Sequence, residues 1–121
     1  MTQNVDQIIQ ETMQSYYEYV VKIEGGCSYI TNAFSTNEIE AGIQGIQALS
    51  EGLSWLIEAE KLMQIHSYQI QSPISEVIPL FEKINAALEA ENFDELGTLV
   101  EMELRPLFKH AVDWKFIQKV S

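Results

Sequence analysis

Apolar residues recur at intervals of three and four along most of this chain, which is the spacing that places them on one face of an α-helix. The first stripe predicts a helix over residues 4–24. It comprises Val5, Ile8, Ile9, Met13, Tyr16, Val20 and Ile23. Gly25-Gly26 follows, and each glycine destabilises a helix by about 1 kcal/mol. We therefore expect an interruption at this pair, as a kink or as a loop.

A second and longer helix is predicted from the sequence Ser35-Thr36-Asn37-Glu38 to about His66. The Ser35 hydroxyl can accept a backbone N–H and Glu38 can reach back to the cap, as in a capping box. Its main stripe is Ile39, Ile46, Leu49, Leu53, Leu56 and Met63. A second stripe of mostly small residues lies beside it: Ala41, Gly45, Ala48, Gly52, Trp55, Ala59 and Leu62. Small side chains let another helix approach closely, so we expect a second contact here, within the chain or with another copy.

The third predicted helix follows a polar connector over residues 67–72. Ser72-Pro73 is typical of a helix start, with serine as the cap and proline in the first turn. The apolar stripe then runs through Val77, Leu80, Phe81, Ile84, Ala87 and Leu88. Pro79 lies within this pattern, which indicates a kink or a start nearer residue 77.

A fourth helix is predicted after Asn92, because Glu95 stands three residues later in the capping pattern. Its stripe is Leu96, Leu99, Val100, Leu104, Leu107, Phe108, Ala111 and Trp114. Pro106 cannot donate to Met102, so we expect a bend there. No run alternates with a period of two for long enough to predict a strand. The fold predicted is all-α, an up-and-down four-helix bundle with one long central helix, as a single domain over residues 1–121.

Composition narrows the class of protein. The 121 residues are 46% hydrophobic and 21% charged, as in ordinary globular domains. The single cysteine, Cys27, excludes an internal disulfide and is expected to be a small buried hydrophobe. With no secretory signal and no apolar run of membrane length, we expect a cytoplasmic location and no membrane association. The formal net charge of −11 disfavours nucleic acid as a partner, because phosphate binding rests on Lys and Arg.

Metal-binding chemistry has little support in the sequence. Helical di-iron proteins use Glu-x-x-His pairs, but Met63 precedes His66 at that spacing and Leu107 precedes His110. Glu60, Glu103 and His110 remain a candidate polar cluster or weak metal site. Such groups more often lie at the edge of a core with their charges in water. We therefore predict no metal and no cofactor.

One catalytic reading is kept as an alternative. Arg105 and His110 match the Arg-x4-His spacing of HEPN-type helical ribonucleases, whose dimers hold phosphate with arginine and use histidine for acid–base chemistry. In this chain Pro106 occupies a position where that family tends to have a polar residue, and the acidic charge is unsuited to RNA. The alternative function is therefore a ribonuclease using Arg105 and His110 across a dimer.

Aromatic residues provide the leading hypothesis. Tyr16 and Tyr17 point about 100° apart on a helix, so at least one ring is expected near the surface. Exposed aromatic rings are enriched where proteins bind partners. The candidate partner-binding residues are Tyr16, Tyr17, Tyr19, Trp55, Gly45 and Gly52. We predict a non-enzymatic interaction or adaptor-like protein that binds an unknown protein or peptide, and a homodimer is also compatible with the small-residue stripe.

Two segments resemble a known group of proteins. Glu51-Gly-Leu-Ser-Trp-Leu56, and Glu101-Met-Glu-Leu-Arg-Pro-Leu107 with Trp114 beyond it, resemble small uncharacterised acidic proteins of Bacillus- and Clostridium-like bacteria. That family would have tyrosine where Met102 stands. The resemblance implies a helical structure and a cytoplasmic location, but no activity and no functional residues. By size, acidity and plan the chain is also similar to bacterial helical export chaperones, including the flagellar type, at the level of the fold alone.

Overall fold

The computed structural model describes residues 2–119, and it confirms the predicted helical class. The long helices are α1 (Thr2–Val20), α2 (Ile23–Ser35), α3 (Ile39–Ile65) and α4 (Ile74–Glu89). A last helical segment consists of α5 (Phe93–Thr98), the π-helical turn η1 (Leu99–Leu104) and α6 (Arg105–Leu107). The 3-10 turn η2 (Ala111–Asp113) follows. Two short strands, β1 (Tyr68–Gln69) and β2 (Ile117–Gln118), pair antiparallel.

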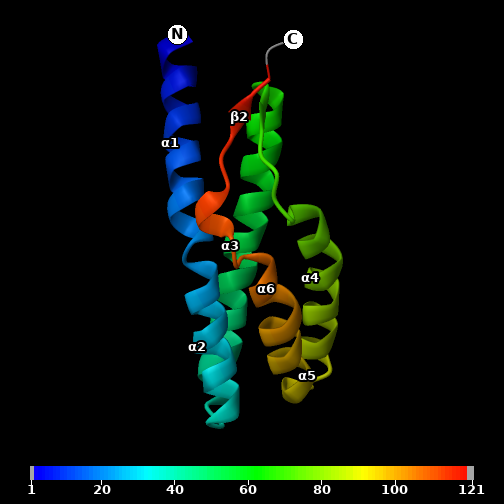
Figure 1. The fold of residues 1–121 in the computed structure, drawn as a ribbon. Helices are drawn as coiled ribbons and strands as arrows, with labels where there is room; N and C mark the ends of the chain where they lie inside the picture. Colours follow the sequence, from blue (N-terminus) through cyan, green and yellow to red (C-terminus); the bar gives the residue numbers. More distant parts are fainter. Residues whose placement is uncertain (1, 120–121) are drawn as a thin grey trace.

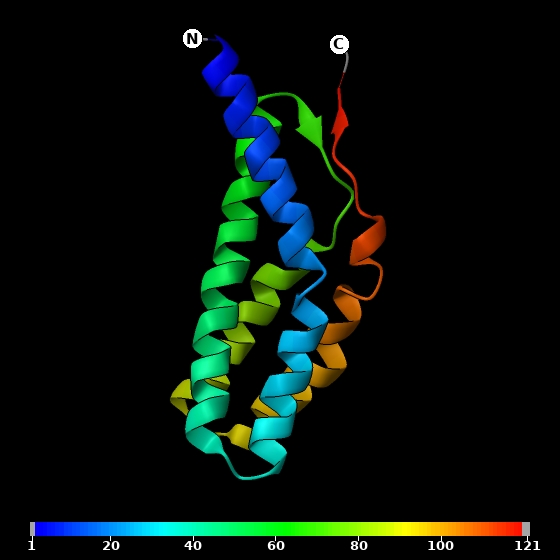
Figure 2. The same cartoon turned by 90° about the vertical axis from the view of Figure 1, so that its left-hand side faces the viewer.

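The helices divide the molecule into two unequal halves. α1 and α2 follow one another nearly end to end and lie beside α3, which runs back in the opposite direction (Figure 1). α4 and the segment from α5 to α6 lie only against the half that contains α2 (Figure 2). Around α1, the place of these helices is taken by the connector with β1 and by the extended segment with β2 (Figure 1). One half is therefore fully helical, and the other is completed by two extended strands.

The core runs through both halves and is built from the predicted stripes. Its largest fully buried side chains include Tyr16, Phe108, Ile23, Ile30, Ile46, Leu53, Leu56, Met63, Leu96 and Leu104. These side chains come from α1, α2, α3 and the last helical segment, except Phe108, which directly follows α6. Burial of apolar side chains stabilises the fold by about 25 cal/mol per Å² removed from water. The surfaces described below lie on helices that this core holds in place, above all on α2 and α3.

The predicted position of the first helix break, at Gly25-Gly26, is wrong. α1 ends at Val20, and α2 begins at Ile23 with both glycines inside it. The Gly26 amide donates to the carbonyl of Lys22 at 3.1 Å. Ile23, Cys27 and Ile30 are fully buried along this helix, and tertiary packing of an apolar face outweighs weak helix propensity. The chain therefore breaks two residues before the glycines.

The capping box predicted at Ser35 is also wrong. Ser35 ends α2, and the hydroxyls of Ser35 and Thr36 donate to the carbonyl of Asn32 at 3.0 and 2.9 Å. Asn37 takes a left-handed conformation (φ 63°), which reverses the chain before α3 begins at Ile39. The two hydroxyls therefore close the preceding helix, which offers them acceptors one turn earlier.

The second capping prediction is confirmed. The Asn92 side-chain oxygen accepts the Glu95 amide at 3.2 Å, and the Asn92 side-chain nitrogen donates to the Glu95 carboxylate at 2.9 Å. α5 then begins at Phe93. At the previous helix, α4 begins at Ile74 and contains Pro79, so the alternative of a later start is wrong.

The helix departs from regular α geometry next to Pro106. The turn before it, Leu99–Leu104, is widened to π geometry, and the Arg105 amide bonds to the carbonyl of Val100. A proline ring collides with the carbonyl four residues earlier in a regular helix, and a wide turn is one way to avoid the collision. The helix ends at Leu107, well before the predicted limit near Trp114.

Candidate functional site

The small-residue stripe of α3 faces α1 and α2 of the same chain. A Cβ atom built on Gly45 would lie 2.7 Å from the Ile30 side chain. A Cβ atom built on Gly52 would overlap the ring of Tyr19. The close approach expected from the small residues therefore occurs within the chain at these two positions. The Tyr19 ring packs directly against Gly52.

A groove opens beside this contact, between α2 and α3. Its volume is about 390 Å³, and we call it the tyrosine groove. It is lined by Tyr19, Lys22, Ile23, Gly26, Tyr29, Ile30, Gly45, Ala48 and Leu49. Tyr29 is 59% exposed, and Trp55, 39% exposed, lies edge-on to Tyr19 with their ring centroids 6.4 Å apart. Four of the candidate residues, Tyr19, Gly45, Gly52 and Trp55, therefore lie in or next to one surface feature.

Tyr16 is a residue of the interior. Its side chain is fully buried, and its hydroxyl donates to the Glu60 carboxylate at 2.5 Å. Ser72 donates to the same Glu60 oxygen at 2.6 Å. Burial raises the pKa of Tyr16 well above its ordinary value, and the bond to Glu60 raises it further. The group of three side chains ties α1, α3 and the connector before α4 together.

Tyr17 contacts the C-terminal segment instead. Its hydroxyl accepts the backbone amide of Phe116 at 2.9 Å, and the Lys115 ammonium lies 4.7 Å from the centre of its ring. The Phe116 ring packs edge-on to Tyr16 with centroids 4.9 Å apart. The amide of Lys119 donates to the carbonyl of Ser67 at 2.6 Å, next to the β1–β2 pair. Residues 114–119 form a strap that these contacts hold across α1.

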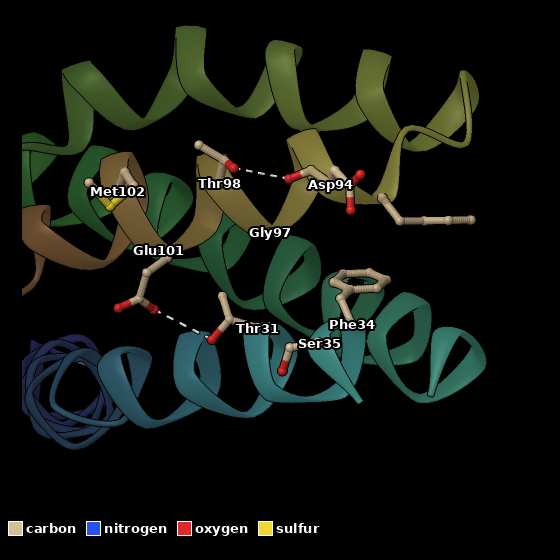
Figure 3. Close-up of a pocket in the computed structure, with 9 residues that line it drawn as sticks. Thr31, Phe34, Ser35, Asp94, Gly97, Thr98, Glu101 and Met102 are labelled. Carbon is tan, nitrogen blue, oxygen red and sulfur yellow. Dashed lines mark hydrogen bonds between the residues drawn. The ribbon is translucent and has the colours of Figure 1, made fainter. Parts of the chain in front are cut away.

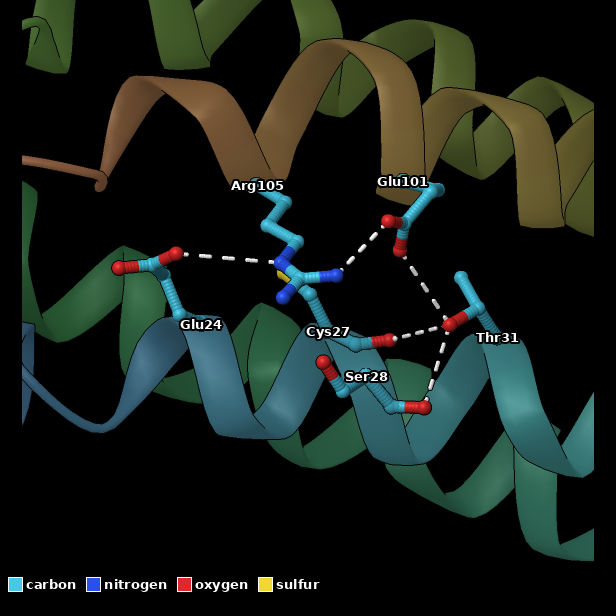
Figure 4. Close-up of polar contacts among 6 residues, drawn as sticks. All are labelled: Glu24, Cys27, Ser28, Thr31, Glu101 and Arg105. Atoms are coloured by element: carbon cyan, nitrogen blue, oxygen red, sulfur yellow. Dashed lines mark hydrogen bonds and ion pairs between the residues drawn. The ribbon is translucent and has the colours of Figure 1, made fainter.

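A chain of polar contacts joins α2 to the last helical segment (Figure 4). The Arg105 guanidinium donates to Glu101 at 2.7 Å and lies 3.8 Å from the Glu24 carboxylate. The second oxygen of Glu101 accepts from the Thr31 hydroxyl at 3.4 Å. Arg105 is thus held between two carboxylates from different helices, and a phosphate would have to compete with both of them.

Cys27 lies below Arg105 and is fully buried (Figure 4). Burial raises the pKa of its thiol to about 12, although the Arg105 charge acts in the opposite direction. The thiol therefore stays protonated near neutral pH. The thiolate, which is the reactive form of cysteine, is not populated there. This agrees with the prediction of a small buried hydrophobe.

His110 lies beyond the end of α6, exposed at the turn before η2. The helix that was expected to carry both Arg105 and His110 ends at Leu107, so the two residues do not share a helical face. The cluster considered from Glu60, Glu103 and His110 does not form. Glu103 lies 3.8 Å from Lys83, and within the described part of the chain no three His, Cys, Asp or Glu residues gather as a metal site.

A second groove lies between α2 and the segment from α5 to η1 (Figure 3). We call it the α2–η1 groove; its volume is about 340 Å³. It is lined by Thr31, Phe34, Ser35, Phe93, Asp94, Gly97, Thr98, Glu101 and Met102. Sequence reasoning missed this site because its residues come from two distant segments and form no motif. The one available signal was Phe34 and Phe93, two large apolar residues close to predicted helix ends.

These observations define a mostly helical protein whose described surface carries the tyrosine groove, a groove between α2 and η1, and an ion-paired seam. The chain belongs to the family described as a domain of unknown function, DUF8042, whose model matches residues 11–113. This agrees with the resemblance to an uncharacterised family. Neither the curated proteins nor the solved structures contain a significant match. No helix within residues 2–119 has both the length and the apolarity needed to cross a membrane.

Proposed function

We propose that this chain is a non-enzymatic protein-interaction module. It is a single helical domain on an up-and-down four-helix plan around α3, and it binds an amphipathic helix of a partner protein in the tyrosine groove. The observation that carries the proposal is the exposure of Tyr29 and Trp55 beside a groove whose lining includes the small residues Gly26, Gly45 and Ala48.

The residues that line the groove suit the binding of a helix. Gly26, Gly45 and Ala48 form part of its lining with no bulky side chain of their own, while Tyr19 and Tyr29 supply aromatic walls. Amphipathic helices bind by placing apolar side chains, spaced three and four residues apart, into grooves of this kind. Tyrosine provides a large rigid contact area together with a hydroxyl that tolerates water, which suits the edge of an interface.

A positive charge beside the groove indicates which charged residue the partner should carry. Lys22 lines the groove, and among the residues from 4 to 119 no carboxylate comes within ion-pair distance of it. In a chain with a net charge of −11, such a lysine is free to pair with an acidic residue of the partner. The proposed partner helix therefore has an apolar face with a carboxylate at its edge.

Site-specific photocrosslinking tests this proposal. A benzophenone amino acid replaces Ala48, which lines the groove and is exposed, and in a matched control it replaces the exposed Glu82 on α4. In cells we expect one defined protein to crosslink at position 48 and not at position 82. Adding Tyr29→Ala should remove that product, because it deletes one wall of the groove. Equal products at both positions, or a product that survives Tyr29→Ala, would overturn the proposal.

The mass in solution distinguishes a partner protein from a second copy. The proposal expects light scattering to give a monomer at micromolar concentration. A stable dimer that Tyr29→Ala converts to a monomer would show that the groove is filled by another copy of this chain, against the proposal of a different partner.

A further inference from the structure

The polar side chains of the α2–η1 groove present hydrogen-bond acceptors. Ser35 donates its hydroxyl proton to the carbonyl of Asn32 at 3.0 Å, and Thr98 donates to that of Asp94 at 3.0 Å. Thr31 donates within the chain as well, to the carbonyl of Ser28 at 3.1 Å among others. Each hydroxyl therefore offers only its oxygen lone pairs to a ligand. The two carboxylates in the lining are likewise acceptors when ionised.

The side chains of the lining offer no matching donors. None of its nine residues, all within the described chain, carries a side-chain N–H group. A ligand suited to these side chains is therefore rich in hydrogen-bond donors. Among protein side chains, the lysine ammonium has three donors and the arginine guanidinium five, and neither has an acceptor.

The apolar wall distinguishes between these two cations. Phe34 and Phe93 stack with their ring centroids 5.7 Å apart and their planes 20° from parallel. Met102, which is 69% exposed, lines another part of the groove (Figure 3). A planar guanidinium stacks on aromatic faces and is more weakly hydrated than an ammonium, so this wall favours arginine.

The residues around the phenylalanine pair include carboxylates, whose negative charge suits a cationic ligand. A second hollow of about 310 Å³ also borders Phe34 and Phe93, and its lining includes Glu91 and Asp94. Asp94 therefore borders both hollows. Across the part of the chain with described side chains, no lysine or arginine lies within ion-pair distance of Asp94. At the other end of the groove Glu101 already binds the chain's own Arg105, so the carboxylate left to a ligand is Asp94.

We propose that the α2–η1 groove binds an arginine side chain of a partner protein, with its guanidinium against the Phe34–Phe93 pair and paired to Asp94. This inference does not rest on the tyrosine groove, which lies on another side of α2 and involves none of these residues.

An NMR titration with two short peptides tests the inference. The probe is acetyl-Gly-Arg-Gly-amide, and the control peptide has citrulline, the neutral analogue, in place of arginine. We expect the arginine peptide to shift the amide signals of Thr31, Gly97 and Thr98, and the citrulline peptide to leave them unchanged. Shifts of equal size with both peptides, or shifts spread over the acidic surface without a focus on this groove, would overturn the inference.

Two variants locate the bound cation. Asp94→Asn should weaken arginine binding about two- to fivefold, the range for losing one exposed ion pair while the aromatic contact remains. Asp6→Asn removes the same charge from exposed α1 at the far end of the molecule and should leave affinity unchanged (Figure 1). An equal effect of these two substitutions would reduce the interaction to general attraction by the acidic chain and so refute the site.

Blocking the groove provides an independent readout. Gly97 lines it, and a Cβ atom added there meets no described atom within 4 Å beyond the adjacent residues and the backbone of its own helix. Gly97→Leu should therefore keep the fold and abolish the shifts caused by the arginine peptide. If thermal unfolding shows that leucine is not accepted, Gly97→Ala replaces it and should weaken binding. Unchanged affinity in a folded variant would contradict the proposal.

Discussion

Replacing Gly52 by alanine should destabilise this protein, although alanine is the better helix former. In the middle of an exposed helix the exchange is favourable by about 1 kcal/mol. Here the added methyl group would overlap the Tyr19 ring, which lies on Gly52 and meets Trp55 edge-on. Overpacking costs about 1–3 kcal/mol, and displacing Tyr19 would lose an aromatic contact of about 0.5–1.5 kcal/mol. The net loss expected is about 0.5–3.5 kcal/mol, with a central value of about 2 kcal/mol.

The same substitution should change sign when Tyr19 is absent. In Tyr19→Ala the space above Gly52 is open, so only the gain in helix propensity remains, and Gly52→Ala should stabilise by about 0.5–1 kcal/mol. Urea unfolding followed by circular dichroism measures all four proteins of this double-mutant cycle. The expected signature is a coupling free energy of about 2 kcal/mol or more between the two sites.

Gly97→Ala provides the matched control. Apart from the residues next to it in the chain and the backbone of its own helix, no described atom lies within 4 Å of a Cβ atom at Gly97. This exchange should therefore stabilise by about 0.5–1 kcal/mol whether or not Tyr19 is present. The reasoning fails if Gly52→Ala stabilises the wild-type protein, or if its effect is the same in both backgrounds. The first result would show that Tyr19 moves aside at no cost.

Three further predictions concern the interior and the strap. Tyr16→Phe should destabilise the protein by about 1.5–3 kcal/mol in urea unfolding, because the buried Glu60 carboxylate loses a hydrogen-bond donor. If the effects of Tyr16→Phe and Glu60→Gln are additive, the two side chains are not a coupled pair. The pKa of the Cys27 thiol is raised from 9.0 to about 12, so the folded state holds the proton more tightly and this stabilisation is lost as pH rises from 9 towards 12. Between about pH 8.5 and pH 10 the wild type should therefore lose about 1 kcal/mol more stability than Cys27→Ala, and parallel pH profiles would contradict this. Phe116→Ala should speed hydrogen exchange at the Lys119 amide while α2 is unaffected, and an equal change in both would mean that the strap does not open separately.

The extent of α3 could be predicted because two regular stripes run along its whole length. The helix observed, Ile39–Ile65, ends one residue before the predicted limit. Adjacent tyrosines also behaved as helical geometry requires, with Tyr16 buried and Tyr17 only half-buried. In these cases the relevant physics is local, so it can be read from the spacing of residues.

Features that depend on tertiary packing could not be predicted in this way. Gly25 and Gly26 have weak helix propensity, but the buried side chains around them keep the segment helical. The α2–η1 groove brings residues 31–35 together with residues 93–102, and neither segment contains a pattern that predicts contact with the other. The sequence likewise offered no sign that Tyr19, rather than a partner, would occupy the surface of Gly52.

The π-helical turn has a consequence for how relatives of this chain can differ in length. A π turn holds one residue more than the α-helical path that it replaces. Deleting one residue between Leu99 and Leu104, together with replacing Pro106 so that no proline ring meets the restored α-helical carbonyl, would convert the turn to α geometry while Leu96 and Phe108 both keep facing the core. A deletion elsewhere in a helix rotates everything beyond it by about 100° and turns its apolar face outward. In an alignment of this family, a gap of a single residue inside a helix should therefore fall at this turn.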